Sequence, residues 1–258
     1  PESSRTMLEF PRRRRIYLMR HGEAAYVSPD GTVTDDPRNV PLTATGIEQA
    51  QVQGKVLADV KMDRIICSGL PRTVETATQV LAQANVEQPT DLEIIPELEE
   101  IHGMKGDRQW PPGNGASTAE VLADIANPWA NGAHPEATFL GGEPFADFGK
   151  RVATKWEHIL DDSSWQTLLL VLHGGVNRMI FNHTIGLSWR GDLCIEQDNC
   201  CINIIDVDDT SPRRTASEAE PRTHYRRRLS DLGRLNLPEP HHGLGAGADH
   251  RPDARREP

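Results

Sequence analysis

The chain has 258 residues, 37% of them hydrophobic, and a formal net charge of −10, so it can bury one sizeable core and is acidic overall. It has no apolar run of about 18 residues and no apolar signal segment at its N-terminus, which predicts no membrane-spanning helix and a cytoplasmic location. The acidic residues concentrate between 16 and 208, which argues against nucleic-acid binding through a basic face, and the cysteines show neither disulfide nor zinc spacing.

The N-terminal part of the chain places an arginine and a histidine after a predicted strand. Residues 1–15 are polar and end in four arginines, and we interpret them as a solvated basic arm. The apolar run 16–19 is typical of a buried strand, and Arg20, His21 and Gly22 follow it directly. Residues just past such a strand reach the crevice where α/β folds bind ligands. An arginine that holds phosphate oxygens and an imidazole nucleophile therefore predict a phosphoryl-transfer site.

The next segment has the pattern of an amphipathic helix. Thr43 is a suitable N-cap for a helix over 43–60, and Val52 and Val56 are among the apolar residues that we expect on its buried side.

A second strand and helix bring another arginine. Residues 64–67 form a short strand that leads to Ser68, and Pro71 suits the first turn of a helix that continues to residue 81. Arg72 then lies at a strand-to-helix turn, where its planar guanidinium can hold phosphate oxygens. Ser68 can add a hydroxyl to the same site, or it can only cap the turn.

A third strand candidate, 92–95, precedes a cluster of carboxylates. Phosphate-ester hydrolysis needs an acid to protonate the leaving oxygen, and the same group can then activate water. Glu97, Glu99 and Glu100 are the candidates. Clustered glutamates are also typical of a solvated surface, so the cluster by itself does not select one of them.

Residues 102–142 differ in composition from their surroundings. They are rich in proline and glycine and contain one short predicted helix over 117–125. Because they lie between Glu100 and Glu143, we interpret them as a cap or specificity insertion above the strand ends.

The rest of the chain supplies the second histidine. Residues 143–160 have the spacing of a helix with a core-facing apolar stripe, and the strand 167–172 delivers His173 before a helix over 176–185. A last strand is expected over 201–205. Residues 209–258 are polar and rich in proline and arginine, which predicts a disordered C-terminal tail.

Strands that alternate with helices predict an α/β fold, a three-layer α/β/α sandwich with a mostly parallel central sheet. Parallel strands bring their carboxyl ends to one edge of the sheet. The histidine and arginine segments that follow three strands are therefore expected to meet there.

The chain resembles the histidine phosphatase superfamily, also called the phosphoglycerate mutase-like family, over residues 16–207. The matching motifs occur in the family's order. They are Arg20–Glu23, the stretch from Pro41 to Ala50, Ser68 with Arg72 and Thr76, Gly142 and Glu143 with Arg151, and His173 with the two glycines after it.

The resemblance implies a role for each site residue. His21 corresponds to the nucleophile, Arg20 and Arg72 to the phosphate clamp with Gly22 beside them, and His173 to a donor to the phosphoryl group. The family's phosphatase branch has its acid in a Leu-x-Glu-Ile sequence, which places Glu100 in that role, with Glu97 and Glu99 as alternatives.

One position departs from the family. Asparagine often stands six residues after the nucleophile, where it contacts the phosphoryl group, but this chain has Val27. Asn39 or Asn177 are candidates to replace it.

The sequence therefore predicts a phosphomonoesterase that acts on a small phosphorylated metabolite through a phosphohistidine. A mutase is the main alternative, and a non-catalytic phospho-ligand binding module is the next. Hydrolysis is favoured because the insertion is poor in the arginines with which mutases hold a second anionic group. No metal or other cofactor is implied, because no Walker loop or metal-ligand motif is present. The expected partner is a phosphate ester, not nucleic acid or a membrane, and a homodimer is compatible with the sequence.

Overall fold

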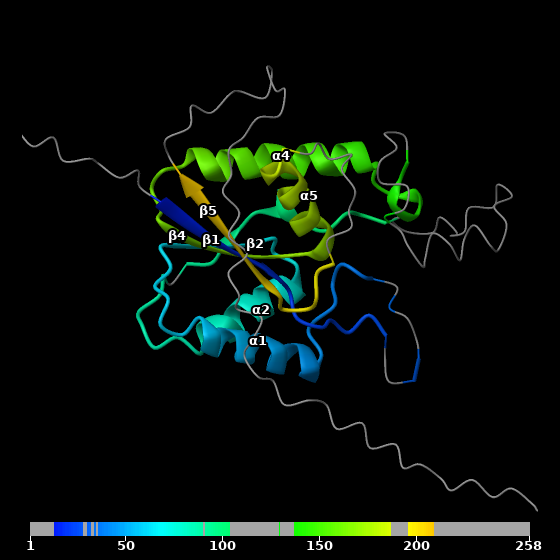
Figure 1. Ribbon diagram of the computed structural model, residues 1–258. Helices are drawn as coiled ribbons and strands as arrows, with labels where there is room; N and C mark the ends of the chain where they lie inside the picture. The colour runs from blue at the N-terminus through cyan, green and yellow to red at the C-terminus, as the bar shows by residue number, and fades with distance from the viewer. Residues whose placement is uncertain are drawn as a thin grey trace, which may run out of the picture.

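A five-stranded sheet lies at the centre of the molecule, between two layers of helices (Figure 1). The computed structural model describes residues 13–208, apart from 28–29, 32–33, 35, 90, 104–128, 130–136 and 187–195. The strand order is β3-β2-β4-β1-β5, with β5 antiparallel to β1 and the other neighbours parallel. The strands are β1 (Arg13–Arg20), β2 (Arg64–Cys67), β3 (Glu93–Ile94), β4 (Thr167–Leu172) and β5 (Ile202–Asp208).

The helices cover both faces of the sheet, which confirms the predicted three-layer α/β/α sandwich. In Figure 1, α1 and α2 lie below the sheet and α4 and α5 lie above it. Their bounds are α1 (Ala44–Val56), α2 (Pro71–Leu81), α4 (Phe145–Asp161) and α5 (Gly174–Thr184), with 3-10 turns at η1 (Pro96–Leu98) and η2 (Phe139–Gly141).

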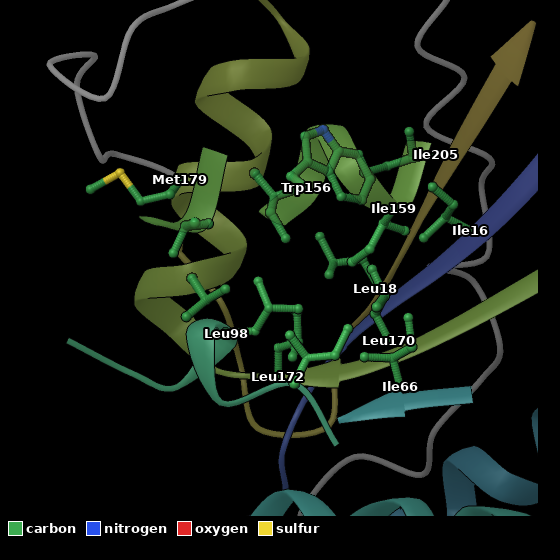
Figure 2. Packing of buried hydrophobic residues seen from close by; sticks show 14 of the residues in the cluster. Ile16, Leu18, Ile66, Leu98, Trp156, Ile159, Leu170, Leu172, Met179 and Ile205 are labelled. Carbon is green, nitrogen blue, oxygen red and sulfur yellow. The ribbon is translucent and has the colours of Figure 1, made fainter. Parts of the chain in front are cut away.

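Alternating side chains of β1 divide the core into two clusters. Ile16 and Leu18 pack on the side of α4 and α5, whereas Tyr17 and Met19 pack on the side of α1 and α2. Figure 2 shows the first cluster, in which Trp156 of α4 lies among residues of the sheet. Because apolar groups cover both faces of the sheet, the sequences of β1 and β4 contain continuous apolar runs.

The first strand begins earlier than the apolar pattern predicts. The prediction of a solvated arm is therefore wrong for its last residues, 13–15. β1 starts at Arg13, and Arg14 is fully buried. Its guanidinium donates to the carbonyl oxygens of Leu160, at 2.8 Å, and Asp162, at 2.7 Å, and lies 4.4 Å from the ring of Trp165. The last carbonyls of a helix lack partners within the helix, and a buried arginine satisfies them at the end of α4.

The first helix also differs from its prediction. Thr43 is its N-cap, as expected, and its hydroxyl accepts from the amide of Gly46 at 3.0 Å. The helix ends at Val56, however, and Val52 and Val56 are exposed. The buried positions Gly46, Ala50 and Gly54 are small, because α1 packs closely against neighbouring backbone.

Several expectations lie outside the described residues. These are residues 1–12, the tail 209–258, the helix over 117–125 and most of the insertion 102–142. Among the described residues, no helix is long and apolar enough to cross a membrane.

Candidate active site

His21 lies directly after β1, and its backbone and side chain are both held in place. Its amide donates to the carbonyl of Leu172 at 2.9 Å, and its own carbonyl accepts from the amide of Cys200 at 3.2 Å. The Nδ1 atom lies 2.7 Å from the carbonyl oxygen of Gly22. Because a carbonyl oxygen only accepts, Nδ1 carries the proton in this contact and Nε2 keeps its lone pair.

The surroundings of His21 keep its imidazole neutral. Burial lowers the pKa of His21 to about 3, and the positive charges of Arg72 and Arg20 act in the same direction. The hydrogen bond to the carbonyl of Gly22 opposes them, since it favours the protonated ring. An unprotonated imidazole is the form that can act as a nucleophile.

His173 follows β4 and lies beside His21. The two ring centroids are 5.2 Å apart, at an interplanar angle of 65°. Burial, followed by the neighbouring His21 and Arg72, lowers the pKa of His173 well below its usual value. Its Nε2 atom lies 2.8 Å from the hydroxyl of Ser68, whereas its buried Nδ1 has no hydrogen-bond partner among the described residues.

Ser68 is buried and all its hydrogen bonds lie within the protein. Besides His173, its hydroxyl contacts that of Thr73 at 3.1 Å and accepts from the amide of Leu70 at 3.4 Å. The role of Ser68 as a phosphate ligand stays a prediction. Its contact with Nε2 orients the His173 ring.

The phosphate-binding role of Gly22 also stays a prediction. Its amide donates to the hydroxyl of Thr76 at 3.0 Å. A Cβ atom at Gly22 would lie 2.5 Å from the carbonyl oxygen of Gly46. Glycine is required here because α1 approaches the backbone next to His21 so closely.

In the described part of the chain, each of the two arginines keeps a buried nitrogen without a hydrogen-bond partner. Arg72 is almost fully buried, and its Nη1 donates to the carbonyls of Pro37 and Arg38, each at 3.2 Å. Arg20 donates through Nη1 to the carbonyl of Gln197. The buried Nε atoms of Arg20 and Arg72 have no partner among the described residues. Buried donors are nearly always paired, so two unpaired guanidinium donors beside two histidines suit a site for an anion.

The three candidate glutamates have different surroundings. Glu97 is exposed on the surface and pairs with Lys155 at 3.0 Å. Glu99 is largely buried, and its carboxylate pairs with Arg38 and lies 3.2 Å from Nε2 of His102.

Glu100 lies against the start of α5. Its Oε2 accepts from the amide of Gly175 at 2.9 Å, two residues after His173, and its Oε1 accepts from the amide of Ile101 at 3.1 Å. The N-terminus of a helix favours a carboxylate. Of the three glutamates, Glu100 is the one whose carboxylate contacts the segment that carries His173.

The position of the usual asparagine does not contribute a polar group. Val27 is 56% exposed, and Asn177 is fully buried with its side-chain amide 3.4 Å from that of Gln197. Asn39 shows no side-chain hydrogen bond in the described part of the chain that would mark it as a replacement. The neighbouring Tyr26 instead lies next to the site, with its ring centroid 5.6 Å from the guanidinium carbon of Arg72.

The sequence patterns did not identify three residues that contact the site or its neighbouring segment. Tyr26 contacts Arg72, and the backbone carbonyl of Gln197 accepts from Arg20. Arg151 binds residues 97–100, the segment that carries the glutamates. A lone tyrosine or glutamine carries no signal in one sequence, whereas Arg151 belonged to a family motif without an assigned role.

No metal site is evident in the ranges that the structure describes: no group of three or more His, Cys, Asp or Glu side chains converges there.

The fold and the site define an α/β protein with paired histidines and arginines at the carboxyl edge of its sheet. Residues 16–218 match the family model described as histidine phosphatase superfamily (branch 1), and the chain belongs to this superfamily.

Two relatives carry the name adenosylcobalamin/α-ribazole phosphatase. The one from Escherichia coli K12 is 31% identical over 193 residues, 75% of this chain and 90% of its own length. The one from Salmonella typhi is 28% identical over the same shares of the two chains. Among solved structures, the α-ribazole phosphatase from Shigella flexneri is 31% identical with a TM-score of 0.59, over 76% of this chain and 91% of that one.

Proposed function

We propose that this protein hydrolyses phosphate monoesters of a small metabolite through a phosphohistidine on His21. The observation that carries the proposal is the state of His21, a buried and neutral imidazole whose Nδ1 is bound to the carbonyl of Gly22. Its Nε2 lone pair is then available for attack on phosphorus. The relatives from Escherichia coli and Shigella flexneri, which are named as phosphatases, support the same activity.

In the first step, Nε2 of His21 forms a bond to phosphorus while the bond from phosphorus to the ester oxygen breaks. Arg20 and Arg72 offer unpaired donors to the oxygens of the transferring group, whose charge is redistributed in the transition state. Both guanidinium groups are fixed beforehand by contacts to backbone carbonyls. They therefore stabilise the transition state without having to reorganise.

His173 adds a neutral donor. When the hydroxyl of Ser68 donates to Nε2, the proton of the His173 ring lies on Nδ1, the atom that is buried and unpaired. That N–H can then donate to a phosphoryl oxygen. In this scheme Ser68 acts on the phosphate only through His173.

Glu100 is the acid in this proposal. The step requires Glu100 in its protonated form, although the helix N-terminus beside it favours the carboxylate. The protonated carboxyl gives a proton to the departing alkoxide, and the resulting carboxylate then takes a proton from the water that attacks the phosphohistidine. The second step forms the new bond from oxygen to phosphorus, breaks the bond from Nε2 to phosphorus and returns both groups to their starting state. The contact with Gly175 keeps Glu100 beside His173, whereas Glu97 and Glu99 are bound to other residues.

Hydrolysis is favoured over the mutase reaction, in which the phosphoryl group moves from one position of the substrate to another. A mutase must hold a second anionic group, yet the only lysines and arginines that the sequence has between 102 and 150 are Lys105, Arg108 and Lys150. The relatives from Escherichia coli and Salmonella typhi, at 31% and 28% identity, are named as phosphatases.

The test is an assay of the purified chain without added metal on p-nitrophenyl phosphate, α-ribazole phosphate and 3-phosphoglycerate. Free phosphate and product isomers are measured together. The His21→Ala variant should lose activity to a few per cent of wild type or less, because no other group replaces the attacking nitrogen.

The matched control is His158→Ala, which removes an exposed histidine of α4 and should retain full activity. Isomers without free phosphate would indicate a mutase. No turnover of any ester, together with retained phosphate binding, would favour the binding module.

A further inference from the structure

Arg151 of α4 uses all five of its N–H donors: three bind the backbone of residues 97–100, the segment that carries the glutamates, and two bind the side chain of Glu143. Its Nε and Nη2 donate to the two carboxylate oxygens of Glu143, at 2.6 and 2.8 Å. Its Nη1 donates to the backbone carbonyls of Glu97, at 2.7 Å, and Glu99, at 2.8 Å, and its Nη2 also donates to the carbonyl of Glu100, at 3.2 Å. One guanidinium thus joins three carbonyls of a short irregular segment.

The same segment is held on its other sides. The second carboxylate oxygen of Glu143 accepts from the amide of His102 at 3.0 Å. The side chains of Leu98 and Ile101 are buried in the core, on either side of Glu100. These contacts on both sides fix the backbone of Glu100. The fixed backbone in turn places the carboxylate of Glu100 within hydrogen-bond distance of the Gly175 amide.

We propose that Arg151 is the positioning residue for the acid, because it orients the carboxyl group of Glu100 toward the leaving oxygen. The inference rests on the proposed function, in which Glu100 donates that proton. Proton transfer requires heavy atoms about 2.6–3.2 Å apart, and a displacement of about 1 Å can cost roughly a hundredfold in rate. The alternative is that Arg151 and Glu143 only stabilise the fold.

Two substrates of similar size separate these possibilities. Benzyl phosphate releases an alkoxide that must be protonated as it leaves, whereas p-nitrophenyl phosphate releases a phenolate that needs no acid. The quantity to compare is kcat/KM, which reports on the steps up to loss of the leaving group, before the phosphohistidine is hydrolysed. The ratio of the two values, benzyl to p-nitrophenyl, measures how well the acid is placed.

We expect Glu100→Gln to lower this ratio by about tenfold or more, within the usual contribution of a general acid. Arg151→Ala should lower it in the same direction. Arg151→Lys should restore it only in part, since an ammonium keeps the charge but has three donors and no planar fork. If Arg151→Ala does not fold, Arg151→Lys and Glu143→Gln test the same contacts.

The matched control is Lys155→Ala, which removes another cation of α4 that contacts the same segment, through the exposed side chain of Glu97. Its ratio should equal that of wild type. A purely structural role of Arg151 would lower the melting temperature and leave the ratio unchanged, and this result would overturn the inference. If Glu100→Gln itself leaves the ratio unchanged, the acid of the proposed function is wrong, and the role of Arg151 falls with it.

Discussion

At the scale of single residues, the two histidines of the site are held in different ways. His21 is oriented by the carbonyl of Gly22, which fixes the proton on Nδ1. His173 is oriented by a hydroxyl, which can donate or accept, and its other nitrogen has no partner among the described residues. The first arrangement suits a nucleophile and the second suits a hydrogen-bond donor. The partner of each ring therefore determines which nitrogen carries the proton and what the other nitrogen can do.

Arg72 allows a prediction at this scale. Its guanidinium is almost fully buried and fixed by two backbone carbonyls, and its Nε has no partner in the ranges that the structure describes. Arg72→Ala should lower kcat by roughly 10²–10³, by analogy with the loss of one preorganised donor to a developing charge. Steady-state kinetics with p-nitrophenyl phosphate measure the effect.

The control for Arg72 is Arg64→Ala. Arg64 lies at the start of β2, at the opposite end of this strand from Ser68, and its partly buried side chain pairs with Glu93 and Asp162. Since the hydrogen-bond partners of Arg64 among the described residues are these two carboxylates and not residues of the site, this variant should keep its kcat. An unchanged kcat in Arg72→Ala would show that Arg72 does not stabilise the transition state.

At the scale of elements, the start of α1 supports the segment that follows β1. A Cβ atom at Gly46 would clash with the carbonyl of Glu23, and one at Gly22 would lie 2.5 Å from the carbonyl of Gly46. Thr43 strengthens this contact, because its amide donates to the carbonyl of Glu23 at 2.9 Å. The position of α1 therefore helps to set the position of His21.

Gly46→Ala tests this packing. The added methyl group must push α1 away from the backbone of Glu23, and overpacking of this kind typically costs about 1–3 kcal/mol. We expect a lower free energy of unfolding in urea together with a lower kcat. Thr45→Ala, at the neighbouring exposed position of the same helix, should change neither. Normal activity in Gly46→Ala would show that the site tolerates movement of α1.

At the scale of the whole molecule, the buried neutral histidines couple folding to pH. The pKa of His21 is about 3 in the folded state and about 6.5 when unfolded, so between these values the unfolded chain binds more protons. The contribution of His21 to the free energy of unfolding is therefore fully present above about pH 6.5 and falls as the pH drops toward 3. His173, whose pKa is also lowered by burial, acts in the same direction.

Linkage gives the expected size of this effect. Between pH 7 and pH 5, His21 alone should account for a loss of about 2 kcal/mol in the free energy of unfolding. Urea unfolding at the two pH values should show a smaller loss for His21→Ala than for the wild type. Equal losses in both proteins would mean that His21 is not kept neutral by the folded state.

Patterns that depend on neighbouring residues were predicted well. β4 was predicted with its observed bounds, because a strand buried on both faces is a continuous apolar run. The apolar stripe of α4 was also correct, and Phe148, Val152 and Trp156 are all fully buried. Arg14 and Val52 were misjudged, since burial of a charged residue or exposure of an apolar one depends on which partner lies opposite.

By itself, the sequence determined the order of strands and helices, the family, and the histidines and arginines that follow the strands. Local periodicity and short motifs carry that information. Only the tertiary structure decided that Ser68 binds His173, that Glu100 contacts Gly175, and that Arg151 holds the segment of the glutamates. These contacts join residues 105, 75 and 51 positions apart, and such distances are bridged only when the sheet and its two helix layers pack together.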